Sequence, residues 1–104
     1  MVYFDNSATT KPSKEVVEAM VDCMENFFAN PSSAHGLGLK AEKKLNESRI
    51  KVGNLIGADP DEIVFTSGGS EANNMVIRGL LKPSDHVITS TIEHPLFSKL
   101  LIVL

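Results

Sequence analysis

The decisive stretch of this 104-residue sequence is Ile63-Val64-Phe65-Thr66-Ser67-Gly68-Gly69-Ser70-Glu71-Ala72. Its first four residues are β-branched or aromatic and stand between turn formers, a pattern typical of a short strand buried on both faces. Two glycines then turn the chain, and beyond them apolar residues recur at the three- and four-residue spacings of a helix. The stretch therefore predicts a strand over 63–66, a glycine turn, and a helix over 70–80.

The same patterns continue on both sides of this stretch. Downstream, β-branched residues predict a second strand over 86–90. Upstream, apolar residues at helical spacing predict helices over 13–28 and 38–56, with Ser13 as the N-cap of the first and Gly57 ending the second. Because helices alternate with strands, the sequence indicates an α/β fold with a parallel sheet.

The composition is that of a globular protein, with 42% hydrophobic and 22% charged residues. This length fits one domain, for which we expect a hydrophobic core. Ten Lys and Arg against 13 Asp and Glu give a net charge of −3, so no basic surface for nucleic acid is expected. The longest apolar run, over 100–104, is far below the ~20 residues of a membrane span, so no membrane is expected as a partner.

The single cysteine, Cys23, has no partner for an internal disulfide. The chain also opens without the basic and then apolar segment of a secretion signal. Both features point to the reducing cytoplasm. Cys23 lies near the apolar stripe of the first predicted helix, where a small buried side chain is favoured over a nucleophile.

The glycine turn is the first candidate site. Gly68 and Gly69 permit positive φ and a close approach to the backbone, and the first N–H groups of the following helix suit an anion such as phosphate. Ser70 adds a hydroxyl. The turn lacks the lysine of a Walker loop, the third glycine of a dinucleotide fingerprint and the closing glycine of a nucleophile elbow. A purely structural strand-to-helix turn remains the alternative.

His94 is the second candidate, because it follows the second predicted strand. It would lie near the carboxyl edge of the sheet, where open α/β sheets bind ligands and where the glycine turn also lies. A capping or hydrogen-bonding role is the alternative, and it is the role expected for His35. The histidines at 35, 86 and 94 lack the spacing of a ligand pair, so no metal site is predicted.

Four segments together are similar to successive motifs of the cysteine desulfurase family, pyridoxal-phosphate enzymes of the class V aminotransferase group. The segments are YFDNSATT at 3–10, NPSSAHG at 30–36, IVFTSGGSEANN at 63–74 and ITSTIEH at 88–94. The resemblance implies that Gly69 and Ser70 bind the cofactor phosphate and that His94 stacks on the pyridine ring. Both roles agree with a dianion at a helix N-terminus and a flat ring at the sheet edge.

The resemblance also implies a fold, the large domain of a fold type I, aspartate-aminotransferase-like transferase. Residues 1–104 would form its N-terminal fragment, with an incomplete parallel-type sheet. In the family, strands from later sequence lie between those corresponding to 63–66 and 86–90, so this chain alone would leave unpaired edges. Together with the apolar run at 100–104, this favours a truncated, frameshifted or partial chain over a self-contained domain.

In the family, L-cysteine is converted to L-alanine and an enzyme persulfide, whose sulfur passes to acceptor proteins for iron–sulfur clusters and related cofactors. The enzymes act as homodimers. The cofactor lysine and the sulfur-accepting cysteine belong to motifs that this sequence lacks, so we assign no catalytic residue and expect neither covalent cofactor binding nor activity alone. The alternatives are another class V enzyme, such as a selenocysteine lyase or an aminotransferase, and a non-catalytic fragment or module.

Overall fold

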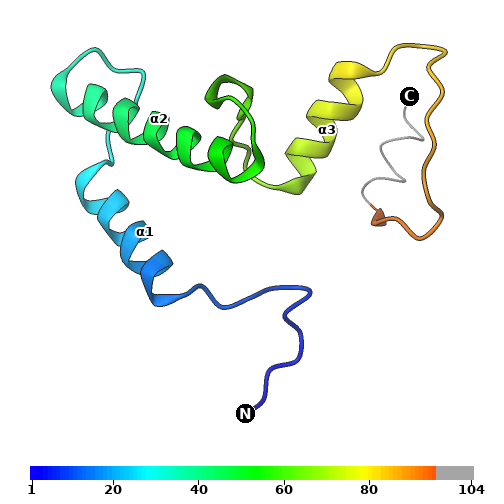
Figure 1. Ribbon diagram of the computed structural model, residues 1–104, viewed down its shortest axis with the longest axis horizontal. Helices are drawn as coiled ribbons and strands as arrows, with labels where there is room; N and C mark the ends of the chain where they lie inside the picture. The colour runs from blue at the N-terminus through cyan, green and yellow to red at the C-terminus, as the bar shows by residue number, and fades with distance from the viewer. Residues whose placement is uncertain (96–104) are drawn as a thin grey trace. The chain divides into compact units, whose positions relative to one another are not determined.

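A computed structural model describes residues 1–95 of the chain (Figure 1). Its elements are α1 (Lys14–Asn26), α2 (Gly36–Ile56), the short 3₁₀ helix η1 (Pro60–Glu62) and α3 (Gly69–Leu80). The chain divides into two compact units, Met1–Ile63 and Val64–Leu104. The first unit therefore contains α1, α2 and η1, and the second contains α3.

The ends of α1 and α2 follow from their capping residues. Ser13 is the N-cap of α1, and its hydroxyl accepts a hydrogen bond from the Val16 N–H at 3.4 Å. The helix α2 begins two residues before the expected position, because His35 is its N-cap and Nδ1 accepts from the Gly38 N–H at 3.2 Å. It ends at Gly57, whose φ of 71° lies in the left-handed region that favours glycine. The roles expected for Ser13, His35 and Gly57 are thus confirmed.

Within the first unit, the end of α1 is tied to α2 by one aromatic ring. The Nζ atoms of Lys40 and Lys44 lie 4.9 and 4.6 Å from the centroid of the half-buried Phe27 ring. Lys44 also forms an ion pair with Asp22, with 3.7 Å between Nζ and Oδ2. Cation–π contacts at such positions contribute roughly 0.5–1 kcal/mol each. This cluster therefore connects the carboxyl end of α1 to α2.

The other end of α2 packs against η1. Here the chain turns back closely, since a Cβ atom at Gly53 would lie 2.6 Å from the Ala58 carbonyl oxygen. The Ala58 N–H donates to the Gly53 carbonyl at 3.0 Å, and the Asp59 N–H donates to the Glu62 carboxylate at 2.9 Å. Glycine at position 53 thus allows the close approach that brings η1 onto α2.

The predicted strands over 63–66 and 86–90 are absent, and no strand occurs within residues 1–95. Ile63 has the extended dihedrals of a strand residue, with φ −92° and ψ 118°. A strand also needs a neighbour that pairs with its N–H and C=O groups, and within the described residues neither segment has one. Residues 1–95 are thus helical, and the parallel sheet of the α/β interpretation is not confirmed within them.

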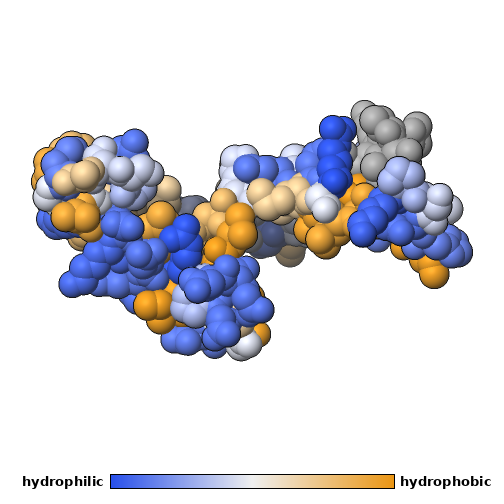
Figure 2. All heavy atoms as spheres, turned by 90° about the horizontal axis from the view of Figure 1, so that it is seen from above, coloured by the Kyte–Doolittle hydropathy of each residue, from blue (hydrophilic) through white to orange (hydrophobic). Residues whose placement is uncertain are grey.

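The expected hydrophobic core is likewise missing from the described residues. The buried hydrophobic side chains are Ala41 and Ile77, with exposed fractions of 6% and 4%. Large apolar side chains reach the surface instead, as the orange spheres of Figure 2 show. Those on α1 are Val16, Val17, Met20, Val21 and Met24, and those on α3 are Met75, Val76 and Leu80. The apolar stripes of these helices therefore lack a partner surface in the described part of the chain.

None of the helices between residues 1 and 95 combines the length and apolar character needed to cross a membrane. The apolar run at 100–104 lies outside the described residues.

Candidate functional site

The amino end of α3 is built by the glycine turn. Gly68 is the N-cap residue and has extended dihedrals, with φ 160° and ψ −178°. The first bond of the helix runs from the Ala72 N–H to the Gly68 carbonyl at 3.1 Å. The N–H groups of Gly69, Ser70 and Glu71 precede that bond, so they have no acceptor within the helix. Because Gly68 has no side chain, it provides no cap for them. The turn therefore presents backbone donors together with the Ser70 hydroxyl.

The space above this turn is open. A Cβ atom added to Gly68 or Gly69 would meet no heavy atom within 4 Å. Neither residue has a left-handed φ, so this turn does not use the left-handed conformation that glycine permits. Their own conformation and neighbours thus do not require glycine. A ligand that approaches the backbone closely would require it, and the donors present fit a phosphate group.

The Glu71 side chain bonds Ser67, the residue that precedes the two glycines. Its Oε2 atom accepts from the Ser67 N–H at 2.6 Å and from the Ser67 hydroxyl at 2.7 Å. The backbone bond, followed by the hydroxyl bond, lowers the pKa of Glu71. On the same turn, the Thr66 hydroxyl donates to the Gly68 carbonyl at 3.2 Å, and the Asn74 amide donates to the Ser70 carbonyl at 2.8 Å. These bonds fix the backbone on either side of the glycines.

Two opposing charges determine the electrostatic field at this turn. The amino end of a helix carries a partial positive charge that favours anions. The Glu71 carboxylate lies in the first turn of α3 and is ionised at neutral pH, so it opposes a second negative charge. Its hydrogen bonds go to Ser67, which precedes the helix, and not to Gly69 or Ser70. The donors of the turn therefore stay available beside a carboxylate that is already hydrogen-bonded.

His94 lies on a different segment of the second unit. It follows a turn in which the Ile92 N–H donates to the Ser90 hydroxyl at 3.3 Å, and its side chain is exposed. The hydrogen bonds described above for the glycine turn come from Thr66, Ser67 and Asn74. The sheet edge that was expected to bring His94 to that turn is absent from the described residues. Gly69 and Ser70 lie together at the start of α3, and within residues 1–95 no strand links the segment of His94 to that turn.

A hollow of about 410 Å³ lies in the first unit, between α2 and η1. Its lining residues are Asn46, Arg49, Ile50, Pro60, Asp61 and Ile63. Within it, Arg49 donates to the Asn46 side-chain oxygen at 2.8 Å. No motif of the sequence predicted this hollow, because it depends on the close return of the chain at Gly53. For metal binding, residues 1–95 contain no group of three His, Cys, Asp or Glu side chains that would hold an ion.

Glu71 is the residue of the glycine turn whose role sequence reasoning missed. It was part of a quoted motif but received no function. A usual capping box pairs a Ser or Thr N-cap with a Glu three residues later. Here the spacing is four, from Ser67 to Glu71, because Gly68 occupies the N-cap position. A serine four residues before a glutamate across a glycine N-cap is the signal that would have identified it.

Comparison with known proteins defines the class of this protein. Residues 2–98 match the family model Aminotransferase class-V, and the chain belongs to that family. The family is generally dependent on pyridoxal phosphate and has the fold type I architecture. The motifs that surround the glycine turn are therefore those of a cofactor-dependent enzyme family.

Individual relatives define the branch of this family. The chain is 47% identical over 97 residues to Cysteine desulfurase IscS of Dictyoglomus turgidum, across 89% of this chain and 25% of the relative. It is 46% identical to Cysteine desulfurase IscS of Methanosarcina thermophila, across 89% and 24% of the two chains. Selenocysteine lyase of Bos taurus is 38% identical over 114 residues, across 89% and 26%. The resemblance to cysteine desulfurases is confirmed, and the chain spans about a quarter of the length of these curated relatives.

Proposed function

We propose that this chain provides the cofactor-phosphate end of a cysteine desulfurase, which converts L-cysteine to L-alanine and an enzyme persulfide. The observation that carries the proposal is the amino end of α3. Donors without an intrahelical acceptor lie there beneath open space at Gly68 and Gly69, in a chain 47% identical to a cysteine desulfurase. The persulfide sulfur would pass to acceptor proteins for iron–sulfur clusters and related cofactors.

In this proposal the chain's residues hold and orient the cofactor. The N–H groups of Gly69 and Ser70 and the Ser70 hydroxyl donate to the phosphate of pyridoxal phosphate, where the helix end favours a dianion. The His94 ring stacks on the pyridine ring. When bound, the cofactor would withdraw electrons from the substrate and so weaken the carbon–sulfur bond of the substrate. The residues of this chain therefore bind and position, and we assign no proton or sulfur transfer to them.

The remaining machinery lies in sequence that this chain does not contain. The cofactor lysine and the sulfur-accepting cysteine occur in no motif of residues 1–104, so we expect the chain alone to be inactive. The full enzyme would act as a homodimer in the reducing cytoplasm, where the sulfur-accepting thiol stays reduced. The missing sheet fits the same proposal, because strands of later sequence would pair with 63–66 and 86–90.

A selenocysteine lyase is the second candidate, and it is favoured by the 38% identity to the bovine protein of that name. Both candidates use the same cofactor-phosphate turn. The two therefore differ in substrate and not in the role of Gly69 and Ser70.

A chimera tests the proposed site in a complete fold. In the desulfurase chimera, the matching quarter of the Dictyoglomus turgidum protein is replaced by residues 2–98 of this chain. We expect it to bind pyridoxal phosphate and to release alanine from L-cysteine. The substitution Ser70→Ala should weaken cofactor binding about tenfold, because a hydrogen bond to a charged group is lost. Cofactor affinity is measured by absorbance titration of protein freed of cofactor.

The control is Ser48→Ala on α2, whose hydroxyl donates to the Lys44 carbonyl within the helix at 2.9 Å. Unchanged affinity in Ser70→Ala would overturn the phosphate assignment. A second chimera, with the same segment in the bovine selenocysteine lyase, separates the two candidates. For each chimera, kcat/KM is divided by the kcat/KM of its unaltered host. A larger fraction in the desulfurase chimera supports the desulfurase, and a larger fraction in the lyase chimera favours the lyase.

A further inference from the structure

We propose that Glu71 is a positioning residue for the anion-binding turn: its carboxylate holds Ser67 in place, and this keeps the first N–H groups of α3 directed at a bound phosphate. The inference rests on the proposed function, since it concerns the same turn. It adds a side chain to which we assign no contact with the phosphate or the pyridine ring and which acts through the backbone of the turn.

The first support is the geometry of the two bonds between Glu71 and Ser67. One carboxylate oxygen receives both the backbone N–H and the hydroxyl of Ser67, at 2.6 and 2.7 Å. Hydrogen bonds to an ionised acceptor are shorter and stronger than those between neutral groups. Together these bonds close a ring around Gly68 and Gly69, the two residues with no side chain to restrict them. The carboxylate thereby supplies the restraint that the glycines lack.

The second support is the difference between α3 and the two preceding helices. At α1 and α2, the side chain of the N-cap residue accepts from an N–H of the first turn, through Ser13 and His35. Such a cap uses up a donor that an anion would need. At α3, the cap residue has no side chain, and Glu71 fixes the turn from outside by bonding Ser67. This arrangement stabilises the turn without occupying the donors of Gly69 and Ser70.

The third support is a conflict of charge. A carboxylate in the first turn repels a phosphate dianion bound at the same helix end. If Glu71 acted by charge alone, it would weaken the proposed site, and its removal would strengthen binding. If it acts by positioning, its removal weakens binding, because the donors lose their common direction. The two roles therefore predict opposite signs for one substitution.

The experiment measures the affinity of the desulfurase chimera, freed of cofactor, for pyridoxal phosphate and for pyridoxal, which lacks the phosphate. We expect Glu71→Ala to weaken pyridoxal phosphate binding about tenfold and pyridoxal binding less than about twofold. Glu71→Gln keeps an acceptor oxygen and removes the charge, so its affinity for pyridoxal phosphate should equal or exceed that of the parent. Ser67→Ala, which loses the hydroxyl bond alone, should weaken binding by a smaller factor than Glu71→Ala.

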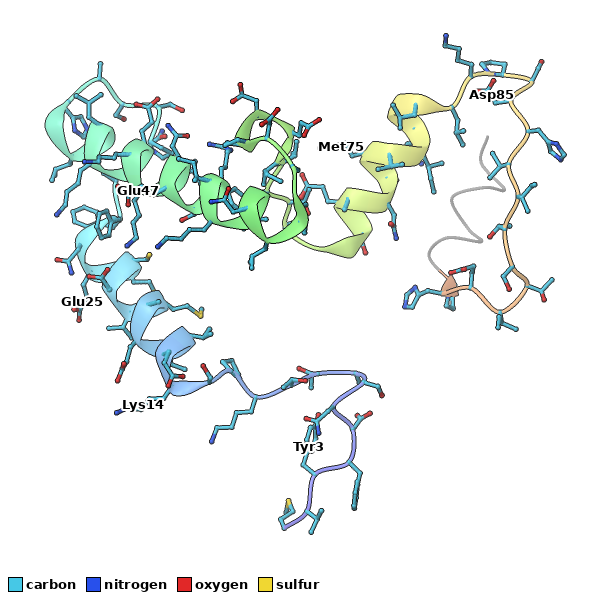
Figure 3. All side chains as sticks on the ribbon, viewed as in Figure 1. Tyr3, Lys14, Glu25, Glu47, Met75 and Asp85 are labelled. Atoms are coloured by element: carbon cyan, nitrogen blue, oxygen red, sulfur yellow. The ribbon has the colours of Figure 1, made fainter. Side chains whose placement is uncertain are left out.

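The matched control is Glu47→Ala on α2, an exposed glutamate labelled in Figure 3, which should leave both affinities unchanged. Circular dichroism reports whether each variant keeps its helices. If Glu71→Ala does not fold, Ser67→Ala tests the positioning role, and parental affinity there overturns it. Tighter or unchanged binding in a folded Glu71→Ala, with weaker binding in Ser70→Ala, overturns the inference and leaves the proposed function standing. Unchanged binding in Ser70→Ala overturns the proposed function itself.

Discussion

The Glu71 carboxylate couples the start of α3 to pH. The hydrogen bonds from Ser67 lower its pKa, so the ionised form is favoured in the folded helix. The contribution to stability is therefore fully present above the ordinary glutamate pKa of about 4.3 and is lost as the pH falls through the lowered value. We expect NMR titration to give Glu71 a pKa below the ordinary glutamate value, and Ser67→Ala to raise the pKa of Glu71.

A site-specific measurement is necessary for this prediction, because the pKa of Glu15 is lowered as well. The Ser13 side chain lowers the pKa of Glu15 at the start of α1, so a helix signal from the whole chain would mix the two groups. An unshifted Glu71 pKa, or one that Ser67→Ala leaves in place, would contradict the hydrogen bonds described here.

The residues that sequence reasoning placed correctly are those with purely local roles. Ser13 and Gly57 act within one turn of their own helices, and His35 bonds Gly38 only three residues away. Gly69 and Ser70 are neighbours at the start of α3, and their assignment to the cofactor phosphate stays a prediction. Glu71 was missed because its partner lies across a glycine N-cap, one residue outside the usual capping box. His94 depended on a sheet edge, and no local pattern supplies that.

The same distinction separates the helices from the strands. The helices expected over 13–28, 38–56 and 70–80 occur at Lys14–Asn26, Gly36–Ile56 and Gly69–Leu80. Each has its backbone hydrogen bonds within itself, so its own sequence is sufficient to specify it. The segments 63–66 and 86–90 have the composition of strands but require partners in other segments. Within residues 1–95 neither segment has such a partner, and the relatives are about four times as long as this chain.

Phe27 should decide whether α1 and α2 behave as a connected pair. The ammonium groups of Lys40 and Lys44 both lie over its ring, whereas the neighbouring Phe28 is 72% exposed. We expect Phe27→Ala to lower the free energy of unfolding by about 1–2 kcal/mol, from two cation–π contacts and lost packing. Urea unfolding of the 104-residue chain, in which Phe28 is exposed, followed by circular dichroism, measures this difference.

The matched control for this element is Phe28→Ala, which removes the same ring from the adjacent position. It should cost clearly less, because no lysine is placed over that ring in the described contacts. Equal losses for the two variants would mean that the ring contacts with α2 contribute nothing to the connection between the helices.

At the scale of the whole molecule, the exposed apolar stripes require a covering surface. On α1, Val16, Met20 and Met24 recur every four residues and are 49%, 55% and 64% exposed. Apolar surface of this kind marks an interface or promotes aggregation when it is left uncovered. If residues outside this chain complete the family fold, as proposed above, they would cover that surface. A self-contained module would keep it exposed in every context.

The effect of one substitution on the stability of the chimera distinguishes these two possibilities. In the isolated 104-residue chain, Met20→Lys should reduce self-association, because it breaks an exposed apolar stripe. In the desulfurase chimera, it should lower the free energy of unfolding by about 2 kcal/mol or more, because the same position is then buried and a lysine there is desolvated. Light scattering measures the first effect and urea unfolding the second, with Glu25→Lys on α1 as the exposed control (Figure 3). If Met20→Lys leaves the chimera as stable as Glu25→Lys does, the stripe stays uncovered in the complete fold. The chain would then be a module that carries the motifs of the family without being part of its enzyme core.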